Sequence, residues 1–531
     1  MAVATVPLDP QSVQAPAAVV SAGAKPPTLG LAHWMNRVLA ECDEAAKDFA
    51  PDPVHDLRVA IRRCRSLGEG MKVIDYAEGW QDMRSAGKVV FRALGELRDV
   101  QVMKDWAEEL GTPDEPATLA LKSYISARES ELKKEAMSAL HDFDRKQWQA
   151  WSKELPRRAR RIRPGSVVFQ HMALERWTAA RNQQRAALRN KTGTALHQLR
   201  ILIKKFRYTV ENFLPERHEA WGDDLKKLQD RLGEVHDLDV LWATAVAQNV
   251  FADEEERVRW HKRIDEERQK RVEKYKEKML GPDSLWAVWR AGLPRGQQVR
   301  AAAIERLKTW ASFMDPDFEH SERVAELARQ LYQGIEDGHR ELQGGKQRKP
   351  IRKRAGLDAE TLLVLAAWLH DVGRFKKEKG HHKVTAGQIR QLEPPLGLSR
   401  QDLKMAAFVA RYHRGILPQS RHRDYVEVAA EARPEAFYLA GVLRFADALD
   451  AGHSGRVTRI RVQNTDGLVK VYAQGYSAYA PGAEEIAASR FLLERSLRKA
   501  IAVKPLVERG GGTRRERRSS AVRNRSAVQS S

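Results

Sequence analysis

The first half of the chain carries the same helical pattern twice, and this repeat limits what the chain can fold into. Residues 55–65 read HDLRVAIRRCR, and residues 197–207 read HQLRILIKKFR. Each copy begins with His and has basic residues three, seven, eight and ten positions later. On an α-helix, offsets 0, 3, 7 and 10 fall within an arc about 80° wide, and the aliphatic residues occupy another arc. The repeat therefore predicts two amphipathic helices, each with a packing face and a row of cations.

A second repeated motif follows each copy at a similar distance. The heptapeptides are LGELRDV and LGEVHDL, and seven residues before each glycine the chain has a lysine, Lys88 or Lys226. The two heptapeptides differ at Arg98, which stands where the second copy has His236. We infer a duplicated helical unit, with an approximate two-fold axis that brings both rows of cations toward one surface.

The sign of the charges distinguishes these rows from an ordinary solvated helix face. Solvated helices mix acidic and basic residues, as residues 252–279 do, whereas the segment from Thr192 to Val210 has five basic residues and no acidic one. Like charges at i,i+3 and i,i+4 repel by a few tenths of a kcal/mol per pair. Because this repulsion occurs twice at identical offsets, the rows favour binding of an anion.

The overall composition agrees with a soluble, anion-binding protein. The chain has 92 Lys and Arg against 71 Asp and Glu, a net charge of +21, which predicts a polyanionic partner, either nucleic acid or another polyphosphate. Its two cysteines exclude a disulfide framework. The longest clean apolar run, residues 362–369, is far shorter than the roughly 18–20 residues that span a membrane. With no export signal recognised either, we expect a cytoplasmic protein without membrane contact.

The two repeated motifs together resemble the CHAD domain, the conserved-histidine α-helical domain, over about residues 31–285. This resemblance implies two antiparallel helical bundles and a central basic cleft that binds inorganic polyphosphate. Arginine can hold phosphate oxygens with two hydrogen bonds, which suits such a ligand. The positions that match the family's basic positions are His55, Arg58, Arg62, Arg63, Arg65 and Lys88 in the first copy, and His197, Arg200, Lys204, Lys205, Arg207 and Lys226 in the second.

The second half contains imidazoles and carboxylates on apolar helices. His320 lies on the apolar face of one helix, His370 and Asp371 end a second, and Asp447 lies on a third. Burying an unpaired carboxylate is costly, so these side chains need a compensating cation or one another. Mixed nitrogen and oxygen ligands suit Mn, Fe or Zn, and Mg where water completes the shell.

The order His, His-Asp, Asp resembles the HD phosphohydrolase domain. The segments LLVLAAWLHDVGRF, ARYHRGILP and LAGVLRFADALD are similar to the C-terminal region of exopolyphosphatase/guanosine pentaphosphate phosphatase proteins, over about residues 299–508. The resemblance implies that His320, His370, Asp371 and Asp447 bind metal and that His370 and Asp371 act in catalysis. Other groups near the site could neutralise substrate phosphates: Arg374, Lys376, Lys377, His381 and His382.

Two alternatives stay open for this half, an active metal-dependent phosphohydrolase and a structural or inactive site in a polyphosphate-binding or dimerisation domain. With the second, the whole chain would be a non-catalytic adaptor that ties proteins to polyphosphate granules. The phosphate loops of the exopolyphosphatase catalytic domains are missing, since the chain contains neither GxxxxGK(S/T) nor GxGxxG. Nucleic-acid binding ranks last, because few aromatic residues accompany the cations.

The expected fold is mainly α: duplicated antiparallel bundles, then an HD-type helical domain with a small β hairpin near residues 457–476. We place the boundary between the two domains at about residues 285–298. Residues 1–30 are expected to be a flexible lead and residues 509–531 a disordered basic tail that supplies +6 of the net charge.

Overall fold

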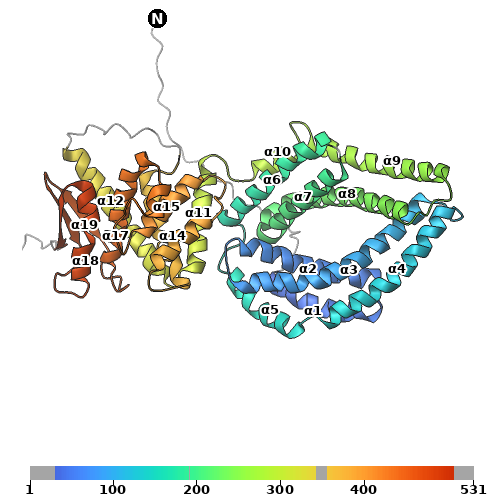
Figure 1. The fold of residues 1–531 in the computed structure, drawn as a ribbon, viewed down its shortest axis with the longest axis horizontal. Coiled ribbons are helices and arrows are strands. Elements are labelled where there is room, and N and C mark those ends of the chain that lie inside the picture. Colours follow the sequence, from blue (N-terminus) through green and yellow to red (C-terminus); the bar gives the residue numbers. More distant parts are fainter. Residues whose placement is uncertain (1–29, 191, 343–355, 507–531) are drawn as a thin grey trace, which may run out of the picture. The chain divides into compact units, whose positions relative to one another are not determined.

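The computed structural model describes residues 30–190, 192–342 and 356–506, and its helices form two compact units (Figure 1). The predicted lead, apart from Gly30, and the predicted tail lie outside the described residues. Unit 1 contains the described residues up to Leu67 together with 86–165 and 186–285, and unit 2 contains 68–85, 166–185 and the described residues from Trp286 on.

The helices of the first half repeat in length as well as in sequence. The paired helices have 22 and 21, 33 and 33, and 26 and 26 residues, for α2 and α7, α3 and α8, and α4 and α9. This match supports the duplication that the repeated motifs predict. The helices are α1 (Leu31–Asp48), α2 (Pro51–Lys72), α3 (Glu78–Leu110), α4 (Pro116–His141), α5 (Arg145–Ala159), α6 (Val167–Asn190), α7 (Gly193–Phe213), α8 (Pro215–Ala247) and α9 (Glu254–Met279).

The packing faces of the two repeated helices are as expected. Leu57 and Ile61 of α2 are fully buried, and so are their counterparts Leu199 and Ile203 of α7. Aliphatic residues at these offsets share one side of each helix, which leaves the cationic row on another side. Thr192 begins α7, because its hydroxyl accepts a hydrogen bond from the Ala195 amide.

Two segments that the sequence analysis places in the first domain belong to unit 2, namely residues 68–85 and 166–185. The indole of Trp177 on α6 packs edge-on against Trp286, with ring centroids 5.8 Å apart. Glu175 of the same helix accepts a hydrogen bond from Arg306. These contacts tie the first part of α6 to the helices that follow residue 285.

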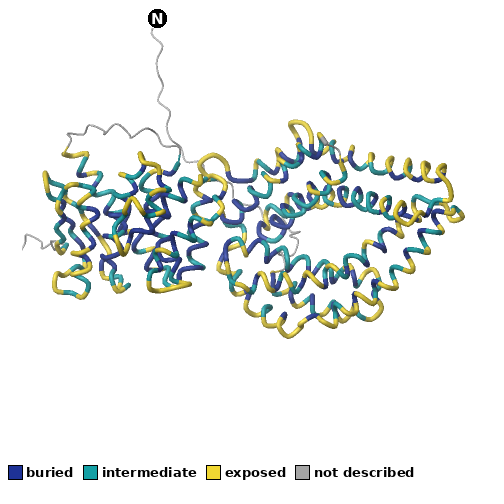
Figure 2. The backbone as a smooth tube through the Cα atoms, in the orientation of Figure 1, coloured by how far each residue is buried: buried dark blue, intermediate teal, exposed yellow. Residues whose placement is uncertain are grey.

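Unit 2 is a helical domain around one aliphatic core, seen as the buried segments of α12, α13, α15 and α17 (Figure 2). Helix α13 is buried along most of its length, and Asp358 caps it by accepting from the Thr361 amide. Its helices are α10 (Leu285–Ala291), α11 (Gln297–Met314), α12 (Phe318–Leu342), α13 (Ala359–Leu369), η1 (Val372–Phe375), α14 (His381–Gln391), α15 (Arg400–Arg411), α16 (Arg423–Glu427), η2 (Ala430–Ala432), α17 (Arg433–Leu449), α18 (Ala483–Ser489) and α19 (Phe491–Leu497).

A small sheet completes unit 2. The predicted hairpin is present as β1 (Ile460–Asn464) and β2 (Leu468–Ala473), which pair antiparallel with Ile460 opposite Ala473. A third strand, β3 (Ala500–Pro505), lies parallel to β2 and was not predicted. The mainly helical fold with a small β element is therefore confirmed, and the β element is larger than a hairpin.

Two further features agree with the sequence analysis. Cys42 and Cys64 are both buried and free, so neither forms a disulfide. Among the described helices, none combines the length and the apolar character that crossing a membrane requires.

Candidate functional site

The two predicted rows of cations meet within unit 1. Arg62 of α2 lies over the ring of Tyr208 of α7, with its Cζ atom 5.7 Å from the ring centroid, and Lys204 Nζ lies 6.0 Å from the same centroid. Loss of water and the surrounding positive charges lower the pKa of Lys204 to about 7. We define the cationic cluster as Lys204 and the four arginines whose charges act on it, which are Arg58, Arg62, Arg65 and Arg200.

The glycines of the second repeated motif lie beside arginines of the cationic cluster, and one of them is close enough to matter. A Cβ atom at Gly95 would lie 2.8 Å from Arg58 Nη1, and one at Gly233 would lie 3.8 Å from Arg200 Nε. Arg58 also covers the ring of Phe91, with Cζ 4.9 Å from the centroid. Gly95 therefore leaves space for Arg58, a function that the sequence analysis did not assign, whereas the contact at Gly233 is an ordinary one.

The aspartates of the same motif were not predicted as site residues. Burial raises the pKa of Asp237 to about 6, and Arg200 opposes this shift. Loss of water also raises the pKa of Asp99, against the charges of Arg58 and Arg200. Both carboxylates thus lie beside the cluster and offset part of its charge. Their equal offset in the two heptapeptides was the signal that could have identified them.

The histidines that begin the two repeated motifs, His55 and His197, lie beside the cluster, and loss of water with nearby positive charges lowers the pKa of both. The rings of His197 and His236 lie 4.4 Å apart, and loss of water, with the charges of Arg200 and His197, lowers the pKa of His236 to about 4. His55 has Arg98 as a positive neighbour, which together with loss of water lowers the pKa of His55. Arg98 and His236 therefore occupy equivalent places, although their chemistry differs.

Glu211 takes up part of the charge of two predicted binding residues. Arg63 forms an ion pair with this buried carboxylate, and Arg207 Nη2 lies 3.8 Å from it. These two arginines are therefore less available to an anion than the cationic cluster is. The remaining predicted lysines are half-buried on α7 or exposed on α3 and α8, namely Lys205, Lys88 and Lys226.

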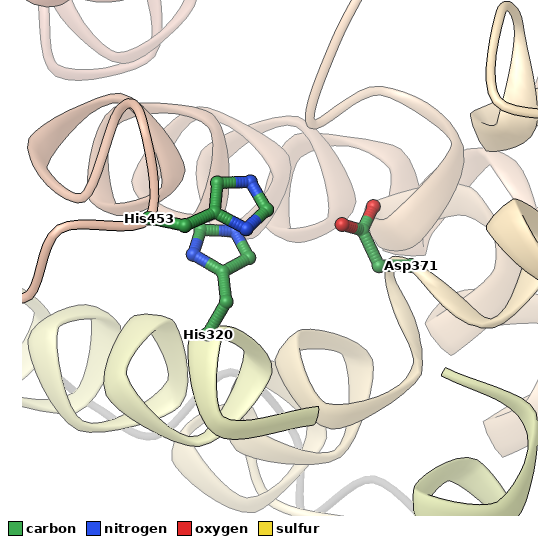
Figure 3. Close-up of side chains that lie close together, drawn as sticks. All are labelled: His320, Asp371 and His453. Atoms are coloured by element: carbon green, nitrogen blue, oxygen red, sulfur yellow. The ribbon is translucent and has the colours of Figure 1, made fainter. Parts of the chain in front are cut away.

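The four predicted metal-binding residues converge in unit 2, where Figure 3 shows two of them, His320 and Asp371. His320 Nε2 lies 3.1 Å from Asp447 Oδ1. His370 Nε2 lies 3.6 Å from Asp447 Oδ1 and 3.6 Å from Asp371 Oδ1. All four side chains are buried. They come from the start of α12, the end of α13 and the end of α17, three helices that pack around the core.

Gly373 brings a further histidine close to this group. A Cβ atom at Gly373 would lie 2.5 Å from the carbonyl oxygen of His381, so only glycine allows η1 to approach α14 this closely. His381 Nε2 lies 3.0 Å from Asp371 Oδ1 and 3.2 Å from His413 Nε2. His381 and His413 thus extend the donor group beyond the four predicted residues.

Three of these imidazoles present a lone pair to the same point. His370, His381 and His413 each place Nδ1 within 2.6–2.8 Å of the backbone carbonyl oxygen three residues earlier. Because a carbonyl only accepts, Nδ1 carries the proton, and Nε2 of each neutral ring is an acceptor. Acceptors that converge on Asp371 Oδ1 repel one another unless a cation lies between them. Metal-binding histidines typically donate the other ring N–H to a carbonyl or carboxylate in this way.

The electrostatics of the site favour a bound cation. Burial would lower the pKa of His370, but the charges of Asp371 and Asp447 raise it to about 9. Although burial alone would raise it, the imidazoles hold the pKa of Asp371 well below its usual range. Burial lowers the pKa of His413 to about 3, so this ring is neutral at pH 7. The carboxylates therefore stay ionised, and either a proton on His370 or a metal ion compensates them.

Two residues after α17 support His320 and were not predicted. Asp450 Oδ2 lies 2.8 Å from His320 Nδ1. The ring of His453 stacks on that of His320 with centroids 3.7 Å apart, as Figure 3 shows. A carboxylate on the far nitrogen fixes the orientation of a ligating imidazole and raises its basicity.

The side chains that were expected to neutralise phosphates differ in availability. Arg374 has carboxylates of its own, with Nη1 3.1 Å from Asp371 Oδ2 and Nη2 3.0 Å from Glu378 Oε1. Loss of water, with nearby positive charges, lowers the pKa of His382 to about 4, so it is neutral at pH 7. Lys376 and Lys377 are exposed.

Comparison with known protein families finds one match in each half of the chain. Residues 30–246 match the model of the CHAD domain. Residues 299–472 match the model of the Ppx/GppA phosphatase, domain III. A search of curated proteins gave no match. The two matches confirm the resemblances on which the sequence analysis relied.

Proposed function

The chain joins a CHAD domain to a Ppx/GppA phosphatase domain III, and from this pairing we propose that its cationic cluster binds inorganic polyphosphate. The observation that carries the proposal is that the cations of both repeated helices lie close together. Loss of water and the neighbouring arginines lower the pKa of Lys204 to about 7 there. A concentration of unscreened positive charge of this kind is stabilised by a polyanion.

The aromatic residues among the cations favour polyphosphate over nucleic acid. Tyr208, which three cations surround, is only 6% exposed. The ring of Phe91 is covered by Arg58 and Arg65. Neither ring offers a face on which a base could stack, and base stacking supplies much of the affinity for single-stranded nucleic acids.

Titration of the full chain with fluorescently end-labelled long-chain polyphosphate tests the proposal. If the five cations of the cluster neutralise phosphates as they do on a single-stranded nucleic acid, log K should fall with log salt concentration with a slope of about −3.5. Binding that does not respond to salt would contradict an electrostatic cleft.

The binding should weaken as pH rises. Lys204, whose pKa is lowered to about 7, loses its charge above that pH. Asp237, whose pKa is raised to about 6, gains a negative charge above pH 6. Both changes disfavour an anion, and a single proton taken up on binding changes the affinity by at most about tenfold per pH unit. We expect weaker binding at each step from pH 5.5 to 8.5, measured by anisotropy.

The variant Lys204→Arg provides the control for this pH dependence. Arginine stays charged throughout that range, so the decrease above pH 7 should become shallower in the variant while binding itself persists. An identical pH profile in the wild type and the variant would remove Lys204 as the titrating group.

A matched pair of glycine substitutions tests the position of Arg58. Gly95→Ala places a methyl group 2.8 Å from Arg58 Nη1 and must displace it, whereas at Gly233 the corresponding approach to Arg200 is an ordinary 3.8 Å. We expect polyphosphate affinity to fall about fivefold in Gly95→Ala, the loss of about 1 kcal/mol. Gly233→Ala should bind like the wild type. Thermal unfolding should show neither variant destabilised, because alanine favours a helix over glycine by about 0.5–1 kcal/mol.

The convergent donors of unit 2 support a second function for the same chain, a metal-dependent phosphohydrolase. We assign His320, His370, Asp371 and Asp447 as ligands of a divalent ion, Mn, Fe, Zn or Mg. His381 and His413 share Asp371 with that group and provide for a second ion. A divalent ion at such a site lowers the pKa of water and polarises a phosphoryl oxygen. Beyond binding metal, His370 and Asp371, both buried, would orient the reacting groups.

The alternative is a non-catalytic adaptor for polyphosphate granules in the cytoplasm. Phosphate release from polyphosphate and from phosphomonoesters, compared between the wild type and Asp371→Asn, separates the two. Metal-dependent release that the variant lacks supports the enzyme, and metal binding without release of phosphate supports the adaptor.

A further inference from the structure

Two arginines near the metal-site carboxylates, Arg414 and Arg444, have Asp447 as a shared acidic neighbour. Arg414 follows His413 directly, and its Nε atom lies 3.6 Å from Asp447 Oδ2. Arg444 lies on α17 three residues before Asp447, so the two side chains project from the same side of that helix. Asp447 is also the acidic group that acts on Arg444, while Arg414 repels it. Within the described residues, the buried Nη1 atom of Arg444 has no hydrogen-bond partner.

The other two arginines of the site differ from this pair. Arg323 Nε lies 2.9 Å from Asp450 Oδ2, and Arg374 contacts both Asp371 and Glu378. Asp447 Oδ1 lies 3.1 Å from His320 Nε2, so the carboxylate that the two arginines share also belongs to the group of metal-binding residues. A divalent ion on Asp447 would draw its remaining negative charge away from the two arginines. Arg414 and Arg444 would then be left as two positive charges without a carboxylate.

We propose that Arg414 and Arg444 bind a terminal, dianionic phosphoryl group beside the metal-binding residues, and so select phosphomonoesters or phosphate chain ends over phosphodiesters and internal phosphates. The proposal rests on the metal-dependent function given above. A terminal phosphoryl group carries a charge of about −1.5 to −2 at pH 7, which matches two guanidinium groups, whereas an internal one carries a single charge. Each guanidinium can donate two parallel hydrogen bonds to phosphate oxygens.

The two arginine side chains differ in exposure, and both can contribute to binding a phosphoryl group. The Arg414 side chain is 54% exposed, so an incoming phosphate can reach it from solvent. Arg444 is partly buried, with one nitrogen in the interior. The partly buried guanidinium has less freedom to move before the ligand arrives than the exposed one has. Preorganised donors of this kind bind a charged group with little loss of entropy.

Calorimetric titration of the Mn²⁺-loaded full chain with phenyl phosphate, a monoester, tests the proposal. Each titration is repeated without Mn²⁺, because phosphate bound in the cationic cluster of unit 1 does not need the metal. The metal-dependent binding should weaken at least about tenfold in Arg414→Gln and in Arg444→Gln, a loss of one charge-assisted contact each. Arg423→Gln, which removes an exposed arginine of α16, should bind like the wild type. Dimethyl phosphate, a diester, should not bind measurably.

Metal content separates failure of this inference from failure of the metal site. If the wild type takes up none of Mn²⁺, Fe²⁺, Zn²⁺ and Mg²⁺, the proposed metal function is wrong, and if it takes up another of these ions instead of Mn²⁺, the titrations use that ion. If Mn²⁺ content is normal and both arginine variants bind phenyl phosphate as the wild type does, the assignment of Arg414 and Arg444 is overturned. Arg444→Lys keeps a charge at the partly buried position and should bind phenyl phosphate with intermediate affinity. This variant shows whether the weaker binding of Arg444→Gln comes from the lost charge or from a folding defect. Displacement of phenyl phosphate by pyrophosphate would extend the site to chain ends, and its absence would assign the site to monoesters.

Discussion

Replacing four residues of the cationic cluster by glutamine should abolish polyphosphate binding without unfolding the chain. The variant carries Arg58→Gln, Arg62→Gln, Arg200→Gln and Lys204→Gln. At about 1 kcal/mol for each lost charge-assisted contact, the affinity should fall about 1,000-fold, and the salt dependence should largely disappear. The substitutions remove like charges that repel one another, so the helical circular dichroism and the thermal midpoint should stay close to those of the wild type.

The control for this variant removes the same number of charges from a solvated helix. Helix α9 carries exposed cations that each pair with a carboxylate one turn away, and the control replaces Arg257, Arg259, Lys262 and Lys270 by glutamine. Net charge changes equally in the two variants, so any difference in affinity reports on position. If the α9 variant loses as much affinity as the cluster variant, binding depends on overall charge alone and the cleft assignment is wrong.

Purified chain should contain tightly bound divalent metal, and substitutions at Asp371 should remove it. Asp371 Oδ1 is the atom on which the imidazole nitrogens of His370, His381 and His413 converge. Asp371→Asn keeps the size of the side chain but loses its charge, so elemental analysis should find no metal in the variant. His370→Ala should behave in the same way, since it leaves a cavity and one ligand fewer. His413→Ala should lower the metal content by one ion and retain the other.

A carboxylate away from the site provides the comparison. Asp337→Asn, on the exposed face of α12, should keep the metal content of the wild type. Unchanged metal in both Asp371→Asn and His370→Ala would remove the metal-site assignment. The assignment would also be wrong if the purified wild type contains no metal and still contains none after refolding with Mn²⁺, Fe²⁺ or Zn²⁺.

The features that could be predicted from the sequence are those that one helix displays by itself. The spacing of His55, Arg58 and Arg62 defines a face whatever the helix packs against, and the repeat at residues 197–207 adds the two-fold arrangement. The residue types at His370 and Asp371, at the end of an apolar helix, likewise indicate their chemistry before any contact is known. For this reason the sequence could predict the cationic rows and the four candidate metal-binding residues, whose side chains the structure brings close together.

The features that were missed depend on which elements pack together. Asp450 and His453 matter only because the turn after α17 lies against the start of α12. Strand β3 pairs with β2 although residues 474–499, which include the short helices α18 and α19, separate the two strands, and its pairing has no local sequence signal. The ion pair between Arg63 and Glu211 joins two helices that are far apart in sequence, so spacing along one helix could not show it.

Competition between polyanions is the measurement that tests the central claim most directly. Labelled long-chain polyphosphate is bound to the full chain, and unlabelled polyphosphate, single-stranded RNA and double-stranded DNA are added at equal phosphate concentration and equal salt. Because the rings of Tyr208 and Phe91 are buried or covered, we expect unlabelled polyphosphate to displace the label at a far lower concentration than RNA or DNA. Displacement at equal phosphate concentrations by all three would contradict a site built for polyphosphate and would leave only a general polyanion binder.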